Sequence, residues 1–229
     1  FIGSNFVHML AELRPEARVV NLDALTYAGN LENLEPVAQH PGQHFVRGDI
    51  TVPEDVERAF VAARALGGAL YVVHFAAESH VDRSLMESGE FIRSEVLGTV
   101  VMLEAARQSK RLKKFLHMST DEVYGDVPDG KFSAETDLLH PRSPYSAAKA
   151  GAEMQVIAYV ETYGLPVVTA RPANNVGPRQ HLEKFVPLCI TNALQDLPLP
   201  VYGDGKQQRD WLYVEDVGEI GRASCRERV

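Results

Sequence analysis

A short apolar run followed at once by polar residues decides how this chain folds: KFLHM at residues 114–118, then STDEVYG at residues 119–125. The first run has the length and the bulky apolar content of a buried β-strand. The polar run begins where that strand must end. Because ligands of open α/β sheets bind at the carboxyl ends of the strands, we expect the polar run to lie at a binding edge.

Similar apolar runs recur on both sides of this strand and alternate with helical patterns. We expect strands at residues 17–22, 44–46, 70–75, 114–118 and 166–170, and helices at residues 32–39, 53–65, 91–108 and 145–163. Strands that alternate with helices of this length predict a doubly wound parallel sheet with helices on both faces, which is the Rossmann architecture.

The same pattern predicts how the chain is divided. Residues 1–171 are expected to form an NAD-binding domain. From Pro172 to Pro200, five prolines interrupt the regular pattern, which indicates a smaller, incomplete substrate-binding region over residues 172–220. We expect truncation at both ends, with the first strand and most of a glycine turn missing, and a foreign tail at residues 221–229. A chain without that strand is expected to be inactive.

Composition argues against several classes of protein. Hydrophobic residues make up 45% and charged residues 24% of the 229 residues, and no apolar run reaches the roughly 18 residues of a membrane span. The net charge of −8 argues against a nucleic-acid partner. Cys189 and Cys225 form no CxxC pair, so we expect neither a disulfide framework nor a metal site, and a reducing cytoplasm.

The first helix and the following strand ends have the features of a dinucleotide site. Gly3 is expected to be the last glycine of the turn that opens a helix at residues 4–13, where it allows helix and strand to pack closely. Asp23 ends the next strand, and its carboxylate would accept the ribose hydroxyls and repel the 2′-phosphate of NADP, which selects NAD. Asp49 ends the following strand and is placed to meet the adenine. His74 is expected to be a packed core histidine.

Five residues have the chemistry of an alcohol-oxidising site with an acid and a base beside it. Tyr145 and Lys149 stand one helical turn apart and project from the same face. A fixed cation beside a tyrosine favours the phenolate, which can then take a proton from an alcohol that Thr120 also binds. The adjacent carboxylates Asp121 and Glu122 repel each other, which predicts one protonated acid and one ionised base.

Segments in fitting order resemble the motifs of the dTDP-glucose 4,6-dehydratase family of extended short-chain dehydrogenase/reductases. They are LTYAGNL at residues 25–31, AAESHVDRS at 76–84, STDEVYG at 119–125, YSAAK at 145–149, NN at 174–175 with GP at 177–178, EK at 183–184 and RDW at 209–211. Val176 and His181-Leu182 depart from the family pattern, in which an aromatic residue and Phe-Pro are common. The nucleotide and sugar preferences are therefore less firmly indicated than the chemistry.

The resemblance implies a role for each site residue. Tyr145, helped by Thr120 and Lys149, would take the proton of the sugar C4 hydroxyl while NAD accepts the hydride. Glu122 would then remove the C5 proton, and Asp121 would protonate the departing C6 hydroxyl. The implied NAD contacts are Gly3, Asp23, Asp49, Ile50, Ala76, Ala77, Ser79, Tyr145, Lys149 and Asn175, and the implied nucleotide-sugar contacts are Ser79, Thr120, Asn174, Lys184 and Arg209. A homodimer built on the helices at residues 91–108 and 145–163 is implied as well.

Two other functions fit parts of this pattern. An NAD-dependent 4-epimerase, or a dehydratase of another nucleotide sugar, would use Thr120, Tyr145 and Lys149, but the acidic pair argues against the epimerase. A catalytically silent NAD-binding module is the alternative of a different class, and the Tyr145 and Lys149 pair argues against it. We therefore expect a lyase that converts dTDP-glucose into dTDP-4-keto-6-deoxyglucose in deoxysugar biosynthesis.

Overall fold

The computed structural model describes residues 1–128 and 130–224. The strands are β1 (Val19–Asp23), β2 (Gln43–Arg47), β3 (Leu70–His74), β4 (Leu112–Met118), β5 (Val167–Ala170), β6 (Asn174–Val176) and β7 (Trp211–Tyr213). The α-helices are α1 (Ile2–Leu13), α2 (Glu35–Ala38), α3 (Pro53–Leu66), α4 (Val81–Met86), α5 (Ser88–Phe91), α6 (Gly98–Gln108), α7 (Pro144–Tyr163), α8 (Phe185–Leu194) and α9 (Val214–Ser224). The π-helix η2 (Ile92–Leu97) joins α5 to α6, and η1 (Leu31–Leu34) and η3 (Asp121–Tyr124) are 3-10 helices.

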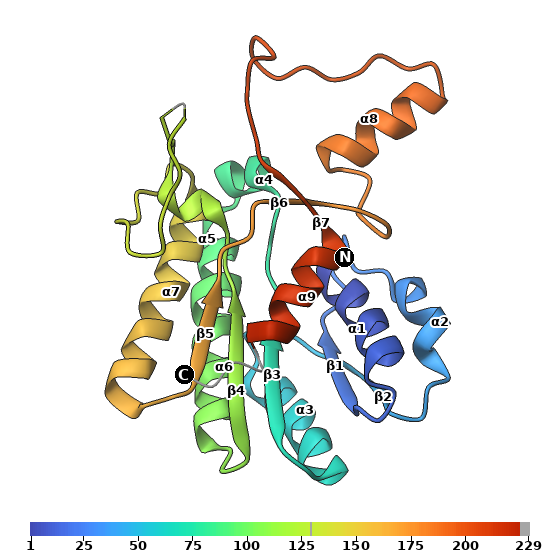
Figure 1. The fold of residues 1–229 in the computed structure, drawn as a ribbon, viewed down its shortest axis with the longest axis vertical. Helices are drawn as coiled ribbons and strands as arrows, with labels where there is room; N and C mark the ends of the chain where they lie inside the picture. The colour runs from blue at the N-terminus through green and yellow to red at the C-terminus, as the bar shows by residue number, and fades with distance from the viewer. Residues whose placement is uncertain (129, 225–229) are drawn as a thin grey trace.

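Both faces of the sheet formed by β3, β4 and β5 are covered. Neighbouring residues of β4 point to opposite faces, because side chains alternate along a strand. Phe115 packs in a cluster with residues of α3, α6 and α7, whereas Leu116 packs in a second cluster with Val217 of α9. Figure 1 shows α1 and α9 on the face toward the viewer and α3 and α6 behind the strands. The prediction of parallel strands with helices on both faces is confirmed.

The strands that the structure describes do not form one continuous sheet, because β1 and β3 do not pair with each other. Within the described residues, β1 pairs with β2, β3 pairs with β4 and β4 with β5, and β6 pairs with β7, all in parallel. The facing edges of β1 and β3 are not hydrogen-bonded to each other, and residues from both strands line a common cavity. The strands were predicted individually, and the first strand that was expected to be missing from the centre of the sheet was expected to leave its neighbours unpaired.

Two predicted helices are divided into shorter elements. The helix expected at residues 91–108 begins earlier, at Ser88, and contains the π-helical turn Ile92–Leu97. The helix expected at residues 32–39 consists of the 3-10 turn η1 followed by the short helix α2. Apolar periodicity predicts that a segment is helical, but it does not distinguish π-helical or 3-10 turns within it.

Gly98 packs closely against Ile50, one of the predicted site residues. A Cβ atom at Gly98 would lie 2.5 Å from Cδ1 of buried Ile50. Alanine favours a helix over glycine by about 1 kcal/mol, but overpacking a core costs about 1–3 kcal/mol. We therefore expect Gly98→Ala to lower the free energy of unfolding, as measured by urea denaturation. Gly89→Ala, where nothing lies within 4 Å of the new Cβ, is the control and should not lose stability; equal effects of both variants would contradict the close packing.

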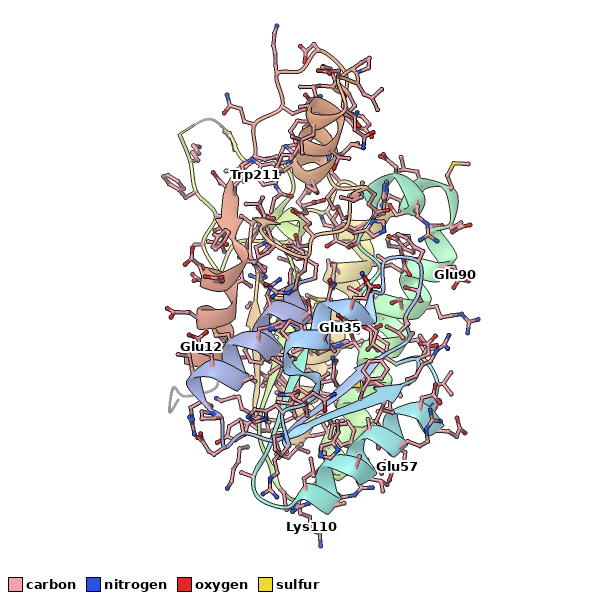
Figure 2. The ribbon with its side chains drawn as sticks, turned by 90° about the vertical axis from the view of Figure 1, so that its right-hand side faces the viewer. Glu12, Glu35, Glu57, Glu90, Lys110 and Trp211 are labelled. Atoms are coloured by element: carbon pink, nitrogen blue, oxygen red, sulfur yellow. The ribbon has the colours of Figure 1, made fainter. Side chains whose placement is uncertain are left out.

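The last third of the chain leaves the sheet and then returns to it. Helix α8 and the segment after it lie at the top of Figure 1, beyond the carboxyl ends of the strands. Figure 2 shows Lys110, which precedes β4, at the bottom of the molecule and Trp211 of β7 toward the top. After Trp211 the chain packs back against the first part, where buried Val217 of α9 joins the cluster around Leu116. The division at residue 171 stays a prediction.

The tail at residues 221–229 was expected to lack regular structure. Helix α9 continues to Ser224, so the first part of this tail is helical. A helix that has already formed extends by one residue at little cost, which explains the difference. Residues 225–229 lie outside the described residues. In the part of the chain that the structure describes, no helix combines the length and the hydropathy that a membrane crossing requires.

Candidate active site

A cavity of about 910 Å³ lies between β1 and β3. It is bounded by α1, by the loops that follow β1, β2 and β3, and by the first turns of α7. The predicted cofactor residues that line it are Gly3, Asp23, Asp49, Ile50, Ala76, Ala77, Ser79, Tyr145 and Lys149. Asn175, also predicted, belongs to β6 and lies outside this lining.

Polar groups in the cavity wall are arranged to meet a polar ligand. Asp23 ends β1, where its Oδ1 accepts the backbone N–H of Leu25 at 2.7 Å. Ser119 Oγ and Gln180 Oε1 are buried without a hydrogen-bond partner among the described residues, and both residues line the cavity. Buried polar atoms are normally hydrogen-bonded, so these two groups indicate a polar ligand or water: the Gln180 oxygen needs a donor, whereas the Ser119 hydroxyl can donate or accept. Sequence reasoning had assigned no role to Ser119 or Gln180.

Gly3 was expected to allow close packing of helix and strand. It lies in the first turn of α1, and a Cβ added there would be 3.5 Å from the Phe75 side chain. That separation is an ordinary van der Waals contact. The approach of α1 to the end of β3 therefore does not require glycine at this position.

Lys149 is held inside the protein by two acceptors. Its Nζ lies 2.8 Å from Oε2 of Glu95 and donates to the backbone oxygen of Met118 at 3.2 Å. Both charged side chains are almost completely buried. Tyr145 is buried one turn earlier on α7, with its ring edge-on to Phe91 at 6.3 Å between centroids. Tyr145 and Lys149 therefore both line the same cavity, as expected.

Burial and nearby groups act on the pKa of Tyr145. Burial raises the pKa of its phenol far above the ordinary value, and the charges of Glu95 and Glu122 raise it further, while nearby Thr120 lowers it. Burial is thus the main effect that opposes the phenolate, and Glu95 lies next to the Lys149 ammonium group. The expectation that Lys149 favours the phenolate stays a prediction.

The acidic pair opens the 3-10 helix η3, and Thr120 caps it. The Thr120 hydroxyl accepts the N–H of Glu122 at 3.3 Å and donates to Oδ1 of Asp121 at 3.2 Å. Burial is the main cause that raises the pKa of both carboxyl groups. Repulsion by Asp121 raises the pKa of Glu122 as a second cause, so the predicted repulsion is present but is not the largest effect. The charges of Arg209 and Lys184 lower the pKa of Glu122.

An ion pair that sequence reasoning missed anchors the end of η3. Arg171 follows β5, and its Nε lies 3.0 Å from both carboxylate oxygens of Glu153 on α7. Its Nη1 donates to the Tyr124 hydroxyl at 2.6 Å. Glu153 is buried, so it is a charged residue on the packed side of a helix. A charged residue within the apolar pattern of a helix was the signal in the sequence that could have revealed this ion pair.

The predicted substrate residues lie around the acidic pair. Lys184 lines the cavity and donates to the backbone oxygen of Ser79. Asn174 starts β6 and donates to the backbone oxygen of Asp210 at 3.4 Å. Arg209 precedes β7 and is close enough for its charge to act on Glu122. Lys184 and Arg209 thus place two cations near the Glu122 carboxylate, and their expected contact with the substrate's diphosphate stays a prediction.

His74 is a core residue, as predicted. It is buried at the end of β3, with Nε2 3.2 Å from the Thr99 hydroxyl. Burial is the main cause that lowers the pKa of His74 to about 3. A neutral imidazole at this position has no charge to offer a ligand.

Comparisons with known proteins agree with this geometry. The family model described as GDP-mannose 4,6 dehydratase matches residues 1–227. A low-salt glycan biosynthesis protein from Haloferax volcanii is 49% identical over 216 residues, which cover 94% of this chain and 67% of that protein. A dTDP-glucose 4,6-dehydratase from Neisseria gonorrhoeae is 48% identical over 227 residues, which cover 94% of this chain and 64% of that protein.

A solved structure is similar over the whole chain. The dTDP-glucose 4,6-dehydratase from Streptomyces venezuelae, solved with NAD bound, superposes with a TM-score of 0.90 at 43% sequence identity. The match covers 100% of this chain and 70% of that one. The chain spans about two thirds of the length of the curated relatives.

Proposed function

Because the chain belongs to the GDP-mannose 4,6-dehydratase family, we propose that the protein removes water from dTDP-glucose and forms dTDP-4-keto-6-deoxyglucose. The observation that carries this proposal is the position of Asp121 and Glu122 next to Thr120, which lies close enough to Tyr145 to act on its pKa. Relatives named dTDP-glucose 4,6-dehydratase support this choice of nucleotide. With only two cysteines in the chain, we expect the reaction to take place in the cytoplasm.

We propose NAD as the cofactor, bound by residues 1–171, with the nucleotide sugar bound mainly by residues 172–220. The part of the cavity at the carboxyl ends of the strands suits a dinucleotide, because a carboxylate ends β1 and the buried oxygens of Ser119 and Gln180 lack protein partners among the described residues. When bound, NAD supplies a hydride acceptor, a hydride donor in the later step, and a positive charge. A positive charge in the cavity would lower the pKa of Tyr145.

Tyr145 then acts as the base for the C4 hydroxyl of glucose. Thr120 lies close to the phenol, so that both side chains can share the substrate hydroxyl. Burial excludes water from the phenol, so that the proton passes between fixed groups. The Lys149 ammonium group lies one turn after Tyr145, on the same buried side of α7.

The acidic pair carries out the elimination. Oxidation at C4 acidifies the neighbouring C5–H, and Glu122 takes that proton. Burial raises the pKa of both carboxyl groups, and repulsion by Asp121 raises that of Glu122 further, whereas Arg209 and Lys184 favour the ionised form of Glu122. We assign to Asp121 the protonation of the departing C6 hydroxyl, as the resemblance to the dehydratases implies.

We also propose that the full-length protein is a homodimer. Helices η2 and α7 pack side by side, and Leu97, Met154 and Ile157 are exposed on them at 43%, 48% and 48%. Exposed apolar side chains on long neighbouring helices favour association. We expect a dimer by sedimentation at micromolar concentration and a monomer after Ile157→Arg. A wild-type protein that sediments as a monomer would reject this assembly.

Mass spectrometry of the reaction product tests the proposed function. The full-length protein with dTDP-glucose and NAD should give a product lighter by one water. UDP-glucose and GDP-mannose, tested in parallel, should react much more slowly. A product of unchanged mass with inverted C4 would identify an epimerase. NAD binding without any change in the sugar would identify a silent module.

A further inference from the structure

One carboxylate lies on the buried face of the helical segment that contains α5, η2 and α6. Phe91, Glu95 and Thr99 recur at intervals of four residues and are 1%, 1% and 0% exposed. Glu95 lies within the π-helical turn of this segment. A buried carboxylate is stable only when it is paired and hydrogen-bonded, and π-helical turns occur frequently at functional sites.

Glu95 uses both carboxylate oxygens to connect three parts of the site. Oε2 lies 2.8 Å from Nζ of Lys149 on α7. Oε1 accepts the backbone N–H of Glu78 at 2.8 Å, and Glu78 itself lines the cavity in the loop after β3. A single side chain therefore joins η2, the proposed catalytic helix and the cavity wall.

These contacts define the orientation of the ammonium group. An ammonium has three N–H donors. Glu95 and the backbone oxygen of Met118 occupy two of them. The third donor then has a fixed direction, and Lys149 lines the cavity together with Tyr145.

The charges of Glu95 and Lys149 both act on groups around the cavity. The charge of Lys149 lowers the pKa of His74, whereas the charge of Glu95 raises the pKa values of Glu78 and Tyr145. Removing either partner would leave the other charge buried and uncompensated.

We propose that Glu95 is a positioning residue of the active site, whose carboxylate holds the Lys149 ammonium against the Met118 carbonyl so that Lys149 meets Tyr145 and the cofactor in one orientation. The kinetic part of this inference rests on the proposed function. NAD affinity can be measured without the sugar, and it therefore tests the contact between Glu95 and Lys149 independently of that function.

The test uses the full-length protein and two changes at Glu95. Glu95→Gln removes the charge, and Glu95→Asp keeps the charge but retracts it by one methylene. We expect each to lower kcat about a hundredfold, as misplacement by about 1 Å can do, with KM for dTDP-glucose little changed. The control is Glu57→Gln, which removes an exposed, ion-paired glutamate of α3 at the lower end of the molecule (Figure 2) and should have no effect.

A double-mutant cycle separates positioning from a general structural role. NAD affinity is measured by calorimetric titration for Glu95→Asp, Lys149→Met and the combined variant. If Glu95 acts through Lys149, Glu95→Asp weakens NAD binding alone but adds no further loss when Lys149 is methionine. Losses that add, or a lower thermal midpoint with unchanged kcat and NAD affinity, would overturn the proposal. If the losses do not add but dTDP-glucose is not converted, the positioning role stands and the proposed function fails.

Discussion

Tyr145→Phe is expected to lower kcat by roughly 10²–10⁴-fold, the range for loss of a general base. Phenylalanine keeps the ring that packs edge-on to Phe91 but removes the hydroxyl that interacts with Thr120. Tyr145 is buried, so bulk water has little access to the place of the lost hydroxyl. The measurement is steady-state turnover of dTDP-glucose, together with calorimetric titration of NAD.

The control for this variant lies on the same helix. Tyr163→Phe removes a hydroxyl from the exposed end of α7, 54% exposed, and should leave kcat unchanged. NAD affinity of Tyr145→Phe should remain close to that of the wild type, because the ring and Lys149 stay in place. Turnover of Tyr145→Phe near the wild-type rate would show that another group removes the C4 proton.

Glu122→Gln is expected to separate oxidation from elimination. The amide keeps the size of the side chain and its place in η3, but it cannot take the C5 proton. Oxidation at C4 depends on Tyr145, so absorbance of NADH should rise when dTDP-glucose is added, while dehydrated product falls by roughly 10²–10⁴-fold. Stopped-flow absorbance and product mass spectra measure the two steps on the same sample.

Loss of both steps in Glu122→Gln, with dTDP-glucose still bound, would contradict this role. The control is Glu161→Gln, an exposed carboxylate near the end of α7. It should support the full reaction without accumulation of NADH.

Local patterns predicted the parts of the fold that depend on local properties. Strand β4 and the polar run after it are adjacent in the sequence, so the position of Thr120, Asp121 and Glu122 at a strand end could be predicted. Tyr145 and Lys149 are one turn apart, so their common face followed from helix geometry.

The ionisation of the site was harder to predict than its residues. Sequence reasoning found no charged partner for Lys149, because Glu95 is 54 positions earlier in the chain and on another helix. Burial, which is the largest cause of the pKa shifts of Tyr145, Asp121 and Glu122, is a property of the packed structure. Charged residues on apolar helix faces, such as Glu95 and Glu153, were the available signals for the missed ion pairs.

The most direct measurement follows a deuterium atom placed on C4 of dTDP-glucose. If this site removes water through transient oxidation at C4, the 4-keto-6-deoxy product formed by the full-length protein should contain the deuterium at C6, as detected by nuclear magnetic resonance. The product mass should correspond to loss of one unlabelled water. Deuterium that remains at C4 or is released to the solvent would contradict hydride transfer from C4 to C6, and with it the proposed dehydration.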